Sequence, residues 1–140
     1  VGECKKCGII YNGKHWQLRS NAPEEILLKE PKVKLICPAC RKIMDNFAEG
    51  YVTIQGGFLK GHKDEILHLI RNKEKIAMDS NPLERIIEIK EKAGGIEVTT
   101  TTEKLAQRIG QMLHKAFHGD VEYKWSDDVK LARVVWVRQE

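Results

Sequence analysis

The sequence predicts an α+β protein, in which a cysteine-bearing N-terminal module precedes a β-α-α-β-α-β-β domain with helices on one face of a small sheet. Three observations predict it. All four cysteines lie in the first 40 residues, in two C-x2-C pairs. After residue 49, β-branched segments alternate with amphipathic helical patterns. No low-complexity linker separates the two regions, so we expect the modules to pack against each other.

The composition is that of a folded protein. The chain has 140 residues, a net charge of +4, 41% hydrophobic residues and 31% charged residues. This balance excludes a disordered or collagen-like chain. The longest apolar runs, such as 134–137, are strand-sized and far shorter than the roughly 18 residues of a membrane helix. Glu3, Lys5 and Lys6 stand where an apolar targeting segment would be, so we expect a cytoplasmic protein with no membrane partner.

The cysteines form the most specific pattern. Cys4 and Cys7 make one C-x2-C pair, Cys37 and Cys40 make the other, and 29 residues lie between the pairs. Two such turns can direct four thiolates at one centre, which suits tetrahedral Zn²⁺. Gly8 follows the first pair, where a positive φ is often needed. We therefore predict that residues 1–48 form a zinc ribbon with one structural Zn²⁺.

Other uses of the cysteines stay open at this point. Two disulfides or four free thiols are possible, although no export signal accompanies them. A thioredoxin-like redox site needs only one C-x2-C pair. The pairs also resemble rubredoxin, which holds one iron and carries electrons. Arg41, where rubredoxin has glycine, and the less acidic segment between the pairs favour zinc over iron.

Short strands are expected within residues 1–48, near 8–11, 15–18 and 32–36. Ile43 and Phe47 are expected to continue a short helix that leads out of the second cysteine pair. Structural zinc can supply about 10–16 kcal/mol of apparent folding free energy, and a module of this size needs such help.

Residues 49–140 are expected to form the α+β domain. Alternation predicts a strand over 51–55, and apolar spacing predicts a helix that buries Ile66, Leu69 and Ile70. Asn81-Pro82-Leu83-Glu84 has the form of a helix start, and we expect a second helix that ends at Gly94-Gly95. A strand follows over 96–99.

The third helix is expected to begin with a capping box formed by Thr100 and Glu103. Its buried face is Leu105, Ile109, Met112, Leu113 and Phe117, and Gly119 ends it.

The last two strands, over 121–125 and 131–137, are expected to form a hairpin around Ser126-Asp127-Asp128. Trp125 or Trp136 is expected in the core. The opposite face of the hairpin is a candidate surface for a protein partner or a second copy.

No enzyme motif is present. The sequence lacks G-x-x-x-x-G-K-[ST], G-x-G-x-x-G and H-E-x-x-H, and the predicted metal site uses every cysteine. We therefore expect a protein without catalytic activity.

Basic and aromatic residues gather near the cysteine pairs and suggest contact with phosphates and bases. The candidate nucleic-acid-binding residues are Lys5, Lys6, Lys14, Trp16, Arg19, Arg41 and Lys42. The alternative is that these residues do not bind nucleic acid, so that the lysines only keep a small module soluble and Trp16 covers the metal core.

A family resemblance points the same way. The segment Cys4-Lys5-Lys6-Cys7, followed by Trp16 and Cys37-Pro38-Ala39-Cys40-Arg41, resembles one set of cysteine pairs in the NMD family, the ribosomal large-subunit export adaptors. Residues 81–86 and 100–110 resemble short prokaryotic proteins grouped with that family. The chain has no room for the further domains of the long adaptors, so export activity does not carry over. The resemblance implies a zinc ribbon held by the four cysteines and an association with ribosomes or RNA.

Three functions follow as hypotheses. The first is a zinc-ribbon protein that binds ribosomal RNA or a ribosome-associated particle. The second is a protein–protein adaptor that uses the C-terminal domain. The third is a rubredoxin-like electron carrier.

Overall fold

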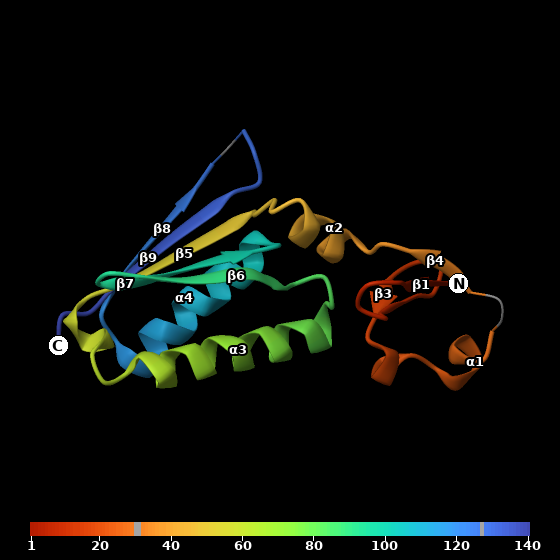
Figure 1. Cartoon of the computed structure of the whole chain (residues 1–140), viewed down its shortest axis with the longest axis horizontal. Helices are drawn as coiled ribbons and strands as arrows, with labels where there is room; N and C mark the ends of the chain where they lie inside the picture. The colour runs from red at the N-terminus through yellow and green to blue at the C-terminus, as the bar shows by residue number, and fades with distance from the viewer. Residues whose placement is uncertain (30–31, 127) are drawn as a thin grey trace.

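The computed structural model describes residues 1–29, 32–126 and 128–140. It confirms the α+β class, with two separate sheets. Figure 1 shows the smaller sheet and its short helices at one end of an elongated molecule, and the larger sheet with two long helices at the other.

The N-terminal module is a four-stranded sheet in the order β3-β2-β1-β4. Its strands are β1 (Gly2–Cys4), β2 (Ile10–Tyr11), β3 (Trp16–Gln17) and β4 (Val33–Leu35). The parallel pairing of β4 with β1 brings the far end of the module beside the first cysteine. The three predicted strands are present but shorter than expected. β1 was not predicted, because three residues hold too little alternation to be recognised.

Helical segments connect and leave this sheet. Between β3 and β4 the chain forms the 3₁₀ turn η1 (Arg19–Asn21) and the short helix α1 (Glu24–Leu27). After β4 it forms α2 (Pro38–Met44), which begins within the second cysteine pair and includes Ile43 as expected. The helix ends before Phe47, which was expected to continue it and is exposed. The first strand of the larger sheet begins soon afterwards, at Gly50, close to the predicted boundary at residue 48.

The C-terminal module is a mixed five-stranded sheet in the order β6-β7-β5-β9-β8. Its strands are β5 (Gly50–Gln55), β6 (Ile86–Lys92), β7 (Gly95–Thr100), β8 (Asp120–Trp125) and β9 (Ala132–Val137). The central strand, β5, pairs antiparallel with β7 and parallel with β9.

Two long helices cover one face of this sheet, α3 (Lys63–Ser80) and α4 (Glu103–Phe117) (Figure 1). A 3₁₀ turn, η2 (Gly57–Leu59), leads from β5 into α3. Alternate residues of the strands, such as Val52, Ile54 and Val98, meet the apolar faces of the helices in one buried core. The helix faces predicted from the sequence are those that the structure buries, with Ile66 and Leu105 fully enclosed.

The helix expected after Asn81 is wrong. Asn81 does accept the backbone N–H of Leu83 on its side chain, at 3.1 Å, but the result is a turn and not a helix start. The chain then enters β6, which forms a hairpin with β7 and is bulged between Ile86 and Glu88. The β-branched residues of this segment gain a partner strand directly across a two-residue turn, and that pairing overrides the local helix signal. The domain is therefore β-α-β-β-α-β-β.

The predicted cap of α4 is displaced by two residues. Thr102, and not Thr100, is the N-cap, and its hydroxyl accepts the N–H of Leu105 at 3.1 Å. Thr100 is the last residue of β7, and its hydroxyl donates to the carbonyl of Thr102. Four consecutive threonines, at 99–102, made the register of the cap ambiguous in the sequence.

The C-terminal hairpin is confirmed, since β8 pairs antiparallel with β9. Trp136 is fully buried and donates to the carbonyl of His118 at 2.6 Å. Trp125 instead lies 53% exposed. Asp127, within the predicted turn, lies outside the described residues. Among the helices of the described residues, none combines the length and the apolar character needed to cross a bilayer.

Candidate metal centre

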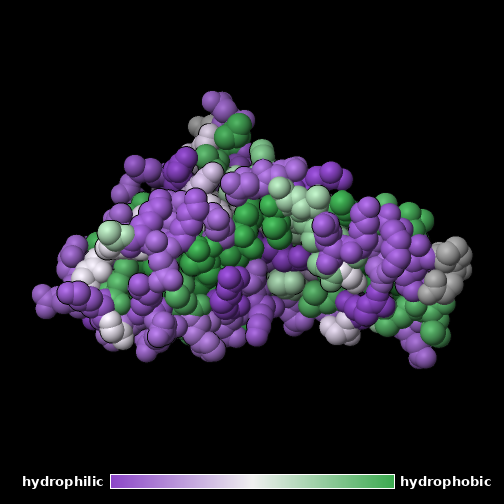
Figure 2. Space-filling model, viewed as in Figure 1, coloured by the Kyte–Doolittle hydropathy of each residue, from purple (hydrophilic) through white to green (hydrophobic). Residues whose placement is uncertain are grey.

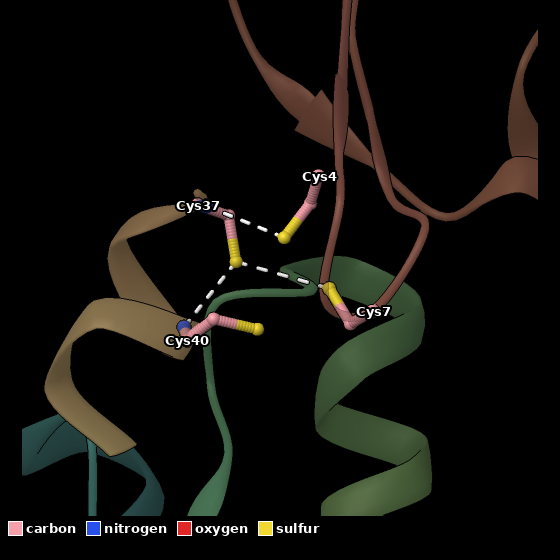
Figure 3. Close-up of side chains that lie close together, drawn as sticks. All are labelled: Cys4, Cys7, Cys37 and Cys40. Carbon is pink, nitrogen blue, oxygen red and sulfur yellow. Dashed lines mark hydrogen bonds between the residues drawn. The ribbon is translucent and has the colours of Figure 1, made fainter. Parts of the chain in front are cut away.

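The four cysteines come from two elements that meet where the ribbon faces the larger domain. Cys4 ends β1, and Cys7 lies in the turn that follows. Cys37 is the N-cap of α2, and Cys40 lies in the first turn of that helix. In Figure 3 the four sulfur atoms point toward a common centre, between the ribbon strands and α2.

The spacing of the sulfurs is that of a single metal site. All four ligand atoms lie within 4.8 Å of one another, and the Sγ atoms of Cys7 and Cys37 are 3.8 Å apart. A tetrahedron with Zn–S bonds of about 2.3 Å has edges of about 3.8 Å. None of the cysteines forms a disulfide. The four cysteines are therefore arranged to bind one metal ion, and the disulfide alternative is wrong.

Backbone groups of the two turns hold the sulfurs in place. The N–H of Cys40 donates to Sγ of Cys37 at 3.3 Å, and the N–H of Cys37 donates to Sγ of Cys4 at 3.4 Å. Gly8 has a φ of +83° and donates to the carbonyl of Cys4, which closes the first turn. A side chain at this position would be strained, as the sequence pattern predicted.

The protonation of the cysteines depends on their surroundings. Burial acts to raise the pKa of Cys4, but backbone hydrogen bonds, from Cys37 first, outweigh it and lower that pKa to about 6. Burial raises the pKa of Cys37 and of Cys40, and neighbouring sulfurs add to the rise. The buried sulfurs of Cys37 and Cys40 therefore do not ionise readily unaided. A divalent cation at their centre would supply the missing positive charge.

The larger domain adds a residue that the sequence did not suggest. Arg85, which precedes β6, is only 7% exposed, and its guanidinium reaches the cysteine cluster. Nη2 donates to Sγ of Cys7 at 3.1 Å, and Nη1 lies 3.9 Å from Sγ of Cys40. Burial acts to lower the pKa of Arg85, but the hydrogen bond to Cys7 and the charges of the Cys7, Cys37 and Cys40 sulfurs together outweigh it and raise that pKa. Arg85 lies 45 residues beyond Cys40, outside the cysteine pattern, so only the fold reveals its contact with the sulfurs.

Apolar side chains enclose the cluster. Ile9 and Ala39 are buried with Cys4, Cys37 and Cys40, and Trp16, Leu18, Ile36 and Leu83 pack against them. Cys7, on the turn after β1, is exposed. The ring of Trp16 also lies against that of Tyr11, with centroids 5.2 Å apart. This packing agrees with the alternative reading of Trp16, as a cover for the metal core.

The structure divides the seven predicted nucleic-acid-binding residues into two groups. Three have partners within the protein. Arg19 pairs with Glu3, Lys42 pairs with Glu49 and donates to the carbonyl of Thr101, and Trp16 is partly buried.

The other four residues, Lys5, Lys6, Lys14 and Arg41, have exposed side chains. No ion pair joins any of them to another described residue.

No family model, curated protein or solved structure matches the chain. Four cysteine sulfurs, with apolar enclosure and hydrogen bonds to the sulfurs, can hold a soft or borderline metal ion.

Proposed function

We propose that this protein is a zinc-ribbon protein, without catalytic activity, that binds structured RNA in ribosomes or ribosome-associated particles. The four-sulfur cluster is the observation that carries the metal part of the proposal. Zinc suits a closed set of four thiolates with a structural role. The ribbon also needs an added stabilising element, because its strands have only two or three residues each.

Zinc is favoured over a rubredoxin-like iron by the second cysteine pair. That pair opens α2, so that Arg41 follows Cys40 within a helix and is exposed. Rubredoxin has glycine at this position, so the second pair departs from the rubredoxin pattern. Elemental analysis separates the alternatives, since one zinc per chain in a colourless protein supports the proposal and one iron contradicts it.

RNA binding is supported by the exposed cations around this rigid centre. Lys5 and Lys6 stand on the turn between the first two cysteines, and Arg41 stands on α2 beside the second pair. A metal-held turn fixes the backbone beneath these side chains, which lowers the entropy lost when they contact phosphates. Ribosomal particles expose such phosphates on folded RNA.

The test is a charge reversal at the four exposed cations of the ribbon. The variant carries Lys5→Glu, Lys6→Glu, Lys14→Glu and Arg41→Glu, and binding to a structured RNA is measured by fluorescence anisotropy over a range of salt concentrations. Because about 0.7–0.9 counterions are released per phosphate contact, we expect the slope of log K against log salt to fall by about 3. Co-sedimentation with ribosomes should fall with it.

The matched control reverses four exposed lysines of the larger domain, at Lys60, Lys75, Lys104 and Lys115. It changes the net charge by the same amount, so general repulsion from RNA affects both variants alike. Equal losses in the two variants, or no loss in either, would contradict a specific role for the ribbon.

A protein partner on the C-terminal hairpin is a second candidate. Trp125 and Val129 are exposed by 53% and 60%, and the ring of Trp125 stacks on that of Tyr123 with centroids 5.9 Å apart. Such an exposed aromatic pair is typical of interface residues. The substitution Trp125→Ser should then weaken self-association or partner capture, and a monomeric wild-type protein with no captured partner would count against this function.

A further inference from the structure

The metal centre draws its surroundings from both modules. The ribbon provides the four sulfurs, and the α+β domain provides the guanidinium of Arg85, which donates to Sγ of Cys7 and lies near Sγ of Cys40. A divalent ion held by four thiolates carries a net charge of −2, because each thiolate contributes −1. Arg85 is therefore the counter-charge to the loaded centre, and it is buried beside it.

Hydrogen bonds within the larger domain, and not within the ribbon, orient the side chain of Arg85. Nε of Arg85 donates to the carbonyl of Pro82 at 2.7 Å, and its backbone N–H donates to the hydroxyl of Thr101 at 2.8 Å. Thr101 in turn donates its hydroxyl to the carbonyl of Leu83 and its N–H to that of Arg85. This closed set of bonds holds the guanidinium in a fixed direction before any metal binds.

Neighbouring residues make further contacts between the modules. Lys42, on α2, donates to the carbonyl of Thr101 at 2.9 Å, and Leu83 packs on the cysteine cluster. A further hydrogen bond joins Asn21 to Asp79 at 3.3 Å, where α3 ends. In Figure 3 the end of α3 and the chain that follows it run beside the four cysteines.

We infer that Arg85 is a positioning residue of the metal centre, and that metal loading docks the α+β domain onto the ribbon. The inference rests on the metal-binding part of the proposed function and is independent of RNA binding. Metals bind cysteines as thiolates, so loading places negative charge next to the guanidinium. Without that negative charge, burying the guanidinium lowers the stability of the contact between the ribbon and the α+β domain. In the metal-free protein this junction between the two modules therefore opens, and the guanidinium returns to water.

Hydrogen exchange on the wild-type protein tests the docking without any mutation. Zinc is added to metal-free, reduced protein, and amide exchange is followed by mass spectrometry in the ribbon and in segments 83–86 and 99–102. We expect zinc to slow exchange in both regions. Slower exchange in residues 1–44 alone would overturn the inference, because the metal would then order only the ribbon.

Variants at Arg85 test its role at the metal. The substitution Arg85→Met removes the charge and the donors and keeps the unbranched stem, while Arg85→Lys restores the charge and one donor. The control is Arg133→Gln, since Arg133 is exposed and its guanidinium lies over Tyr51, 4.8 Å from the ring centroid.

Zinc affinity is measured by competition with a chromogenic chelator. Loss of a hydrogen-bonded group behind the ligands typically lowers metal affinity 10–100-fold. We expect a loss in that range for Arg85→Met, partial recovery for Arg85→Lys and no change for Arg133→Gln. Unchanged affinity in Arg85→Met would overturn the inference.

Cobalt substitution gives a readout that a purely structural role would not move. The energy of the sulfur-to-cobalt charge-transfer band depends on hydrogen bonds to sulfur, so the band should shift in Arg85→Met and not in Arg133→Gln. If no zinc binds to the wild-type protein, the proposed metal function itself fails. If zinc binds and neither the exchange at 83–86 and 99–102 nor the cobalt band responds, only the present inference fails.

Discussion

At the residue scale, five side chains determine the chemistry of the junction. Four sulfurs converge within 4.8 Å, and the guanidinium of Arg85 lies against two of them. Burial raises the pKa of Cys37 and Cys40, so the charge of a metal ion is what makes a full set of thiolates stable there. The cluster therefore links ionisation, metal binding and contact between the two modules.

Replacing a buried ligand should weaken metal binding strongly. Cys37 is fully buried, and its sulfur accepts the N–H of Cys40. If four ligands share about 10–16 kcal/mol, each contributes about 2.5–4 kcal/mol. We expect Cys37→Ser to lower zinc affinity about 100-fold in a chelator competition assay. Asp45→Asn, at the exposed end of α2, should leave the affinity unchanged, and equal affinities in the two variants would refute the assignment.

The sequence predicted the residues of the cluster in part. Cys4, Cys7, Cys37 and Cys40 are recognisable because a C-x2-C pair is a local pattern with one dominant chemical use. Arg85 has no such pattern, and its contact with Cys7 spans 78 residues. The partners of Arg19 and Lys42 were likewise hidden, because ion pairs between distant elements follow from the tertiary fold alone.

At the element scale, close contact between α4 and β9 positions the sheet. Gly110 is buried in the middle of α4, and a Cβ atom there would lie 2.6 Å from Cγ1 of Val134 and 3.1 Å from Cε1 of Tyr123. The helix therefore sits against the sheet at a distance that only glycine permits. Figure 2, in the same view as Figure 1, shows hydrophobic residues among the hydrophilic ones across the middle of the molecule.

The substitution Gly110→Ala should destabilise the protein, although alanine is the better helix former. Overpacking typically costs about 1–3 kcal/mol, and the gain in helix propensity is at most about 1 kcal/mol. We expect a net loss of up to about 2 kcal/mol in the free energy of unfolding, measured with urea. The control, Gln111→Ala, changes an exposed neighbour in the same helix. A Gly110→Ala variant that gained stability would show that the helix packs less closely.

The N-cap of α4 gives a second test at this scale. The hydroxyl of Thr102 accepts the N–H of Leu105. Removing it with Thr102→Ala should cost about 1 kcal/mol of stability, because a helix N–H loses its partner, whereas Thr102→Ser keeps the cap. Thermal unfolding of the two variants measures the difference. Identical unfolding temperatures in Thr102→Ala and Thr102→Ser would show that the hydroxyl of Thr102 does not cap the helix.

Most elements, but not all, could be predicted from local patterns. The core helices and β5 have clear periodicity, and their buried residues match it. The helix predicted after Asn81 was wrong, because Asn-Pro-Leu-Glu is typical of a helix start when it is considered alone. Its pairing with β7 depends on residues 95–100. Local patterns in one segment therefore cannot show whether strand pairing or helix formation is more stable there.

At the scale of the whole molecule, the two modules depend on different sources of stability. The α+β domain has an extended core that includes Trp136, Leu113 and Ile54, all fully buried. The ribbon buries little besides its cysteines, Ile9, Ile10 and Ala39, and several of its larger apolar residues, such as Val33 and Leu28, are exposed. We therefore expect a bound metal to be the main source of stability for the ribbon, but not for the α+β domain.

Metal removal should consequently unfold one module and spare the other. With a strong chelator under reducing conditions, amide signals of residues 1–44 should collapse to disordered positions in an NMR spectrum. The signals of the larger core should keep their dispersion. Lowering the pH should have the same effect, because protons compete with the metal for the thiolates. Loss of both modules together, or of neither, would contradict this division.

The α+β class and the order of the two modules were predictable from the sequence. The separation of cysteines from β-branched segments is a large-scale feature that needs no tertiary detail. The mutual placement of the modules was not predictable, because it depends on a few buried polar contacts, above all those of Arg85 and Thr101.

The most direct test of the central claim is X-ray absorption at the zinc edge of the purified protein. We predict one zinc per chain, with four sulfur neighbours at about 2.3 Å and no nitrogen or oxygen ligand. A shell that contains nitrogen or oxygen, a different metal, or a reduced protein that takes up no zinc would contradict the account.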